Sequence, residues 1–215
     1  MRPTLHLALL VLLASASSFA QTASPPPATP TKPALPRDSH DGVTISADPY
    51  VDAARGKDKF GKANPFEAGI LALEVFLRND RPHALRINLE TIQLEIHFHE
   101  SGRQDIDWLT PIEVADLIAH PRGVPNAQTR RLPGGIPLPN RDKKTGKIAE
   151  MLRPFALDAD ILPPLSTIHG FLFFNLAHRM SLENGATLYV PDIVDIGKNQ
   201  PLIFFEVALG SSDPP

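Results

Sequence analysis

Apolar and polar residues alternate between Gly69 and Glu100, and this pattern predicts the β-strands around which the chain is organised. The apolar positions recur every second residue in three runs, at 71–77, 85–89 and 92–98. A period of two is typical of half-buried strands, which place one face on a core and the other in water. The segment 79–82, Asn-Asp-Arg-Pro, predicts a turn after the first run, because proline lacks a backbone donor and presets a bend.

The alternation changes from odd to even positions between Leu89 and Ile92. A slip of one residue turns every later side chain to the other face of a strand. We therefore expect either a β-bulge or a corner at which the chain passes from one sheet to another. Further strands are expected near the C-terminus, at 168–176, 187–190 and 202–209. The first of these is apolar on both faces, which is typical of a central strand.

One helix is expected in the middle of the chain. Thr110 is a suitable N-cap, Pro111 suits the first helical position, and Glu113 completes a capping box. We expect this helix to continue through Ala119 and to end before Pro121. Its predicted place between the strands makes it an insertion into a chain that is otherwise rich in β-strands.

Two segments rich in glycine and proline, 48–68 and 121–147, are interpreted as loops. The second is unusually long, and such connections are usually either functional or disordered. It is also basic, with seven basic residues and one acidic residue, a local charge of 7 − 1 = +6: Arg122, Arg130, Arg131, Arg141, Lys143, Lys144 and Lys147 against Asp142. One interpretation is a solvated loop. The other is a contact surface for an anionic polymer, lipid head groups or an acidic partner, with candidate partner-binding residues Arg130, Arg131, Lys143 and Lys144.

The N-terminus has the layout of a secretory signal peptide, with a basic head, an apolar run and small residues before Gln21. The run of about 12 apolar residues is too short to span a membrane, whose hydrocarbon core is about 30 Å thick. We expect cleavage after Ala20 and a periplasmic or secreted protein. The expected organisation is a signal peptide at 1–20, a linker rich in Pro, Ala and Thr at 21–40, one domain at 41–210 and a tail at 211–215.

Composition narrows the function further. The chain has no cysteine, so disulfides, thiolate chemistry and a lipid anchor on cysteine are ruled out. Removing the signal peptide takes away one positive charge, Arg2, and changes the net charge from −3 to 20 − 24 = −4. With this net charge, we expect no broad basic surface of the kind that binds nucleic acid. No later segment is long enough to span a membrane.

Glu95, His97 and His99 form the sharpest candidate for chemistry. Residues two apart on a strand share a face, so these three side chains are expected to point together while their neighbours enter the core. Two imidazoles and a carboxylate suit Zn²⁺, Cu²⁺ or Ni²⁺, with a further ligand from His120, His169 or His178. The alternative is that this face is simply polar.

No complete catalytic set is found. Gly56 to Lys62 has the spacing of a phosphate-binding loop, but Ala63 replaces the hydroxyl that would hold Mg²⁺. A serine hydrolase elbow of the Gly-x-Ser-x-Gly type is also missing. We therefore assign no catalytic residue.

Several stretches resemble bacterial extracytoplasmic immunoglobulin-like domains of largely uncharacterised function. They are LALEVFLRND and HALRINLETIQLEI, with STIHGFLFFNL and PLIFFEVAL later in the chain. The resemblance covers about 42–100 and 166–210 and implies a fold without implying a site. Together with the strand pattern, it gives the expected fold class: mainly all-β, an immunoglobulin-like antiparallel β-sandwich of about seven strands, with one inserted helix and a long basic loop.

These observations lead to an expected function of a general kind. The chain is interpreted as an exported, non-enzymatic binding or structural module of a bacterial cell envelope, without a cofactor. Its expected partner is another envelope protein or an anionic polymer. The alternative is a metal-binding protein or metalloenzyme that uses the His-x-His strand to hold a transition metal.

Overall fold

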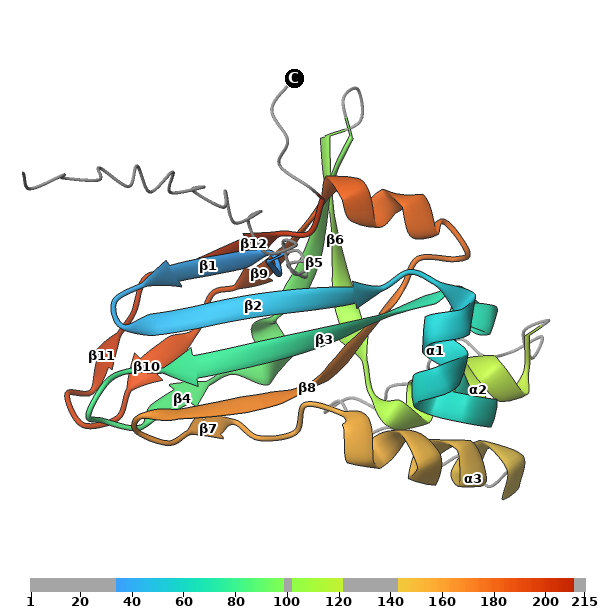
Figure 1. The fold of residues 1–215 in the computed structure, drawn as a ribbon, viewed down its shortest axis with the longest axis horizontal. Coiled ribbons are helices and arrows are strands. Elements are labelled where there is room, and N and C mark those ends of the chain that lie inside the picture. The colour runs from blue at the N-terminus through green and yellow to red at the C-terminus, as the bar shows by residue number, and fades with distance from the viewer. Residues whose placement is uncertain (1–33, 99–101, 122–142, 211–215) are drawn as a thin grey trace, which may run out of the picture. The chain divides into compact units, whose positions relative to one another are not determined.

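The structure, a computed structural model, describes residues 34–98, 102–121 and 143–210, which contain twelve strands and three α-helices. Eight strands form the larger sheet, in the order β1-β2-β3-β8-β6-β5-β9-β12 (Figure 1). Every neighbouring pair in this sheet is antiparallel. The strands are β1 (Arg37–His40), β2 (Val43–Tyr50), β3 (Ile70–Asn79), β5 (Gln93–Phe98), β6 (Gly102–Leu109), β8 (Ser166–Asn175), β9 (Ala186–Val190) and β12 (Phe205–Ala208).

A second, smaller sheet has the order β11-β10-β4-β7 and is also antiparallel. Its strands are β4 (Leu85–Ile87), β7 (Ile161–Leu162), β10 (Ile193–Asp195) and β11 (Gln200–Pro201). The two sheets share one hydrophobic core, to which β3 contributes Leu71, Leu73, Val75 and Leu77 and the small sheet contributes Leu85 and Ile193. The mainly β, antiparallel character expected from the alternating pattern is therefore confirmed.

The helices cover the other face of β3 and β8. They are α1 (Ala53–Phe60), α2 (Pro111–Ala119) and α3 (Lys143–Leu152). Here a second core joins Ile70 of β3 and Phe173 of β8 to Phe60, Val114 and Leu152, one residue from each helix. β3 and the part of β8 from Gly170 to Phe174 are thus buried on both faces, which confirms the prediction for most of the apolar run at 168–176.

Two local predictions are confirmed in detail. The slip in alternation is a corner, because β4 lies in the small sheet, β5 lies in the large one, and a 3₁₀ turn (Leu89–Thr91) separates them. The predicted capping box also forms, since the Thr110 backbone N–H donates to Glu113 Oε2 at 2.9 Å. Both features depend on residues close together in the sequence.

Other expectations were wrong. The chain has twelve strands and three helices in the described part, where about seven strands and one helix were expected. Part of the segment 48–68 is helical, because Asp52 caps α1 by accepting from the N–H groups of Ala54 and Arg55. β1 also lies inside the segment assigned to the linker. Among the helices described, none is long and apolar enough to cross a membrane.

Candidate functional site

A cleft of about 870 Å³ lies between the small sheet and the segments next to α2 and α3. Its walls come from four separate parts of the chain: β4 and the turn after it, the end of β6, the region following α3, and β10 with the residue before it. The lining residues that the following argument uses are Arg86, Glu90, Trp108, Arg153, Leu157, Asp158, Asp160, Asp192 and Val194. A concave site at the junction of two sheets is a common location for ligand binding.

Trp108 forms one wall of the cleft and is held in a fixed position. The register of β6 against β8 places it opposite Phe174, and its indole Nε1–H donates to the Leu89 carbonyl oxygen at 2.7 Å. The ring is half-buried. A fixed, partly exposed indole offers a ligand a large apolar surface at a small entropic cost.

The opposite wall rests directly on β8. Leu157, which is 2 % exposed, donates its backbone N–H to Phe171 O at 3.0 Å. Such a close approach requires glycine at position 170, because a Cβ atom there would lie 2.6 Å from Leu157 Cα. Gly170 therefore determines where the segment that carries Asp158 and Asp160 runs.

The cleft carries charges of both signs with a surplus of carboxylates. Arg86 and Arg153 face Glu90, Asp158, Asp160 and Asp192, a balance of 2 − 4 = −2. Among the described residues, Arg86, Glu90, Asp158 and Asp160 make no ion pair, so these charges stay available to a ligand. The arrangement suits a ligand that has an apolar part and a positive group.

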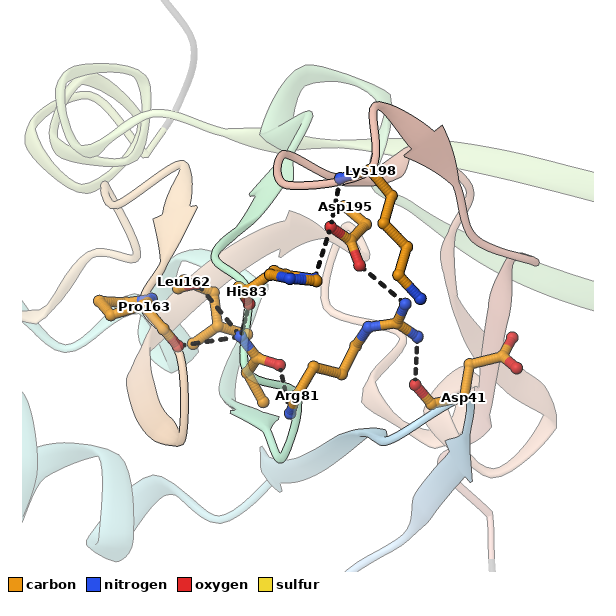
Figure 2. Close-up of polar contacts among 8 residues, drawn as sticks. Asp41, Arg81, His83, Leu162, Pro163, Asp195 and Lys198 are labelled. Carbon is orange, nitrogen blue, oxygen red and sulfur yellow. Dashed lines mark hydrogen bonds and ion pairs between the residues drawn. The ribbon is translucent and has the colours of Figure 1, made fainter.

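A buried charged cluster joins the two sheets beside this cleft (Figure 2). Asp195 of β10 is 0 % exposed and accepts from Arg81 Nη2 at 2.8 Å and from the Lys198 backbone N–H at 3.0 Å. His83 Nδ1 lies 3.4 Å from Asp195 Oδ1, the oxygen that also accepts from Lys198. Burial acts to raise the pKa of Asp195, but these donors outweigh it and hold the pKa below its ordinary value. The cluster fixes β10, and with it the cleft wall at Val194.

The predicted metal-ligating residues are partly brought together. Leu94 and Ile96 enter the core as expected, but Glu95 is also buried, 2 % exposed, instead of facing water. His97 is exposed, and its Nε2 lies 3.8 Å from Glu95 Oε2. His99 lies outside the described residues. Within the described part of the chain, no group of three His, Cys, Asp or Glu residues is arranged to hold a metal ion.

Arg103 of β6 lies opposite His97 and reaches Glu95 diagonally, and its contact with Glu95 is closer than that of His97. Its Nη1 lies 3.1 Å from Glu95 Oε1, close enough for an ion pair, although that oxygen has no well-aligned hydrogen-bond partner. Burial raises the pKa of Glu95, the Arg103 charge lowers it, and Asp105 raises it again, leaving it above its ordinary value. The ionised carboxylate is therefore disfavoured in the fold.

We expect Glu95→Gln to raise the melting temperature at pH 7 by roughly 2 °C and to have no effect at pH 4. A carboxyl group whose pKa is raised by folding destabilises the fold as the pH rises above its unfolded value, near 4.5. Thermal melts of both proteins between pH 4 and 8 measure this. The matched control is Glu67→Gln, an exposed glutamate in the 3₁₀ turn before β3. An effect of Glu95→Gln that is equal at pH 4 and pH 7 would contradict the account.

The predicted basic contact surface is changed by the structure. Lys143 and Lys144 lie in the first turn of α3 and not in a loop. Lys144 Nζ donates to the Ala119 carbonyl oxygen at 3.2 Å, so it also stabilises the C-terminus of α2. Arg130 and Arg131 lie outside the described residues.

A second charged cluster, missed from the sequence, attaches α1 to the sheet. Asp48 and Glu74 are directly opposite one another on β2 and β3, an arrangement that is unfavourable for two carboxylates. Arg55 of α1 donates to both oxygens of Asp48, through Nη1 at 2.9 Å and through Nη2. Lys59, one turn further, lies 3.6 Å from Glu74 Oε1, and Tyr50 OH donates to Oε2 at 3.1 Å. Burial, together with the Glu74 charge, raises the pKa of Tyr50.

We expect Arg55→Met to reduce the free energy of unfolding by about 1–2 kcal/mol, because it removes two charge-assisted hydrogen bonds while keeping the apolar stem. Urea denaturation of the purified protein measures the loss. Lys57→Met is the matched control, since Lys57 is exposed on the same helix. If the two variants lost equal stability, the pairing with Asp48 would not be the reason.

Comparison with known proteins gives little. No family model matches the chain, and no curated protein matches it either. Among solved structures, the chain is similar to a functionally unknown protein from Listeria monocytogenes EGD-e, with 11% sequence identity and a TM-score of 0.35. The similarity covers 81% of this chain and 80% of that one. A TM-score this low supports no conclusion about fold or function.

Proposed function

We propose that the protein is a non-enzymatic binding module of a bacterial cell envelope and that the cleft beside Trp108 is its binding site. The observation that carries this proposal is the cleft itself, about 870 Å³ in volume. It combines a fixed indole with six charged side chains, four of which (Arg86, Glu90, Asp158 and Asp160) make no ion pair among the described residues. Its size falls within the range of pockets that bind small molecules or short peptide segments, roughly 300–1,000 Å³.

The charge of the cleft favours one partner class over the other. Four carboxylates against two guanidinium groups repel an anionic polymer, whereas a basic side chain next to apolar ones complements both the carboxylates and Trp108. The proposed ligand is therefore an extended segment of another envelope protein that contains a lysine or arginine beside an apolar residue. Anionic polymer would instead have to bind the basic residues between 122 and 147.

Export and fold family belong to the same proposal. The signal-peptide layout of residues 1–20 supports an envelope location. The immunoglobulin-like classification is supported by two antiparallel sheets around one core and by the sequence resemblance. Cell fractionation of a tagged full-length chain tests the location: recovery in the cytoplasm with residues 1–20 intact would overturn it.

Capture from envelope extracts tests the binding site. The immobilised mature chain is compared with Asp158→Asn/Asp160→Asn, which removes two cleft charges, and with Asp58→Asn/Glu67→Gln, which removes two exposed charges elsewhere. We expect the cleft variant alone to lose at least about tenfold in capture of a defined protein band, as when one charged contact is removed. A third variant, Arg130→Ala/Arg131→Ala/Lys143→Ala, asks whether the basic residues matter. Loss in that variant alone would move the site to the basic segment.

Metal binding is the second candidate function, supported by the 3.8 Å separation of His97 Nε2 from Glu95 Oε2. Elemental analysis of untagged protein beside His97→Ala/His99→Ala tests it. Near-stoichiometric zinc, copper or nickel in the parent and none in the variant would support this function. No metal in either would reject it and leave a polar strand face.

A further inference from the structure

The first and last strands of the larger sheet lie side by side (Figure 1). Among the described residues, the hydrogen bonds that join them each involve a side chain, and none runs from backbone to backbone. β1 and β12 are at opposite ends of the strand order, and in the described structure they share no ladder. The Glu206 backbone N–H donates to Asp38 Oδ2 at 2.9 Å. His40 Nε2 lies 3.1 Å from the Phe204 carbonyl oxygen, which can only accept, so this nitrogen donates. We call this junction of β1 and β12 the seam.

The two side chains that bridge the seam occupy positions where a core strand would carry apolar residues. Asp38 pairs with Ile45 and His40 with Val43, and both of these β2 residues are 0 % exposed in the shared core. Cross-strand partners share a face, so Asp38 and His40 are on the core side of β1. The His40 ring stacks on Phe205 with centroids 3.8 Å apart. Inward-facing charged residues are one way in which proteins blunt the edge of a sheet.

β1 is held weakly for a strand in this position. It has four residues, and none of its side chains is buried, whereas Phe205 and Val207 of β12 are 0 % exposed. The Asp41-Gly42 turn, with φ angles of 50° and 73°, connects it to β2 as a tight hairpin. Segments with few buried apolar contacts open at low free energy, so β1 is well placed to detach.

An exposed apolar surface continues from the seam. Ile203 and Phe204, immediately before β12, are 64% and 46% exposed, and the Phe204 ring lies 5.6 Å from that of Tyr189. Phe204 also provides the carbonyl that His40 contacts. Exposed apolar residues next to an incompletely paired edge are features of a partner-binding surface.

We propose that β1 is an exchangeable strand and that an extended segment of a partner protein takes its place beside β2. The partner strand carries apolar side chains at two positions two residues apart, where β1 carries Asp38 and His40. It keeps the backbone ladder to β2 and adds apolar burial against Val43, Ile45 and Phe205. This surface is separate from the cleft, and the inference does not rest on cleft binding.

Two peptides of the same composition test whether binding requires the apolar side chains to be on the core-facing side of the strand. The probe is the labelled segment 35–41 with Asp38→Val and His40→Val. The control is the same segment with Arg37→Val, Asp38→Arg, Ser39→Val and His40→Ser, which has the composition of the probe and places the two valines on the opposite face. We expect the probe to bind the mature full-length chain at least about tenfold more tightly, because only its valines can enter the core. Equal binding of the two peptides would overturn the proposal.

Two variants of the chain itself complete the test. Asp38→Ala/His40→Ala weakens the bridge and should increase probe binding, whereas Asp38→Val/His40→Val gives β1 the apolar face and should abolish it. Thermal melts confirm that each variant is folded. Unchanged probe binding in the second variant, or no binding to any form at millimolar peptide, would overturn strand exchange. Light scattering that shows a dimer of the first variant would assign the place beside β2 to the β1 strand of a second copy. That result would contradict a separate partner protein.

Discussion

Asp195→Ala is expected to lower the melting temperature by about 10 °C, because it breaks a buried ion pair. The substitution leaves Arg81, which is largely buried, without its carboxylate partner, and it removes the acceptor of the Lys198 backbone N–H. Arg81 also donates to the Asp41 carbonyl oxygen at 2.6 Å, so the loss reaches the β1–β2 turn. Calorimetry at pH 7 measures the change. Asp192→Ala, an exposed aspartate just before β10, is the control and should melt close to the parent.

The effect of Asp195 should also depend on pH. Because folding lowers its pKa, the carboxylate contributes its full stability above the unfolded value, near pH 4, and loses it as the pH falls through the lower folded value. Melts of the parent and of Asp195→Asn should therefore differ at pH 7 and converge below about pH 4. A difference that stays constant from pH 7 to pH 3 would show that the ion pair is not what stabilises the buried charged cluster.

Gly170→Ala is expected to reduce the free energy of unfolding by about 3 kcal/mol, at the upper end for an overpacked core. The new Cβ would lie 2.6 Å from Leu157 Cα and 2.7 Å from Leu157 N, which are backbone atoms that cannot rotate away. The segment that carries Asp158 and Asp160 must then move, so ligand capture by the cleft should fall together with stability. Urea denaturation and capture assays on one preparation measure both effects.

Gly146→Ala is the matched control. Gly146 lies within α3, and a Cβ atom there meets nothing within 4 Å. Alanine favours a helix over glycine by about 0.5–1 kcal/mol, so this variant should be slightly more stable than the parent. If Gly170→Ala were equally harmless, Leu157 would not be held against β8, and the cleft wall would not depend on that contact.

Local patterns predicted the strands but not their full number. Alternation revealed β3, β5 and β8, the phase slip revealed the corner at Leu89–Thr91, and three residues revealed the start of α2. Each signal lies within about ten consecutive residues. The short strands β7 and β11 have two residues each, too few for any period to be visible.

The helices α1 and α3 were missed because their stability comes mainly from tertiary contacts. α1 has one large apolar residue in the core, Phe60, and otherwise faces the sheet with Arg55 and Lys59. Its signal in the sequence was the i, i+4 spacing of these two cations after the N-cap Asp52. That signal is the same as in an ordinary polar loop unless the partners Asp48 and Glu74 are known to lie nearby. Propensity alone seldom determines so short a helix.

The buried charged cluster around Asp195 and the cleft could not be predicted from the sequence. Arg81 and Asp195 are 114 positions apart, and no local pattern connects them. The cleft likewise takes residues from four distant segments, and its aromatic residue, Trp108, was known only as the single tryptophan of the chain. The His-x-His pattern predicted that Glu95 faces water with His97, but Glu95 is buried. Its contact with Arg103 comes from the neighbouring strand β6, which the pattern within β5 does not reveal.

The fluorescence of Trp108 provides the most direct test of cleft binding, because it is the only tryptophan in the sequence. The mature chain is titrated with an alternating Leu-Lys peptide and with a Leu-Glu peptide of the same length. We expect a saturable change with the basic peptide that is at least about tenfold weaker with the acidic peptide and in Asp158→Asn/Asp160→Asn. Equal responses to both peptides, or an unchanged response in that variant, would contradict a cleft that binds a basic partner segment.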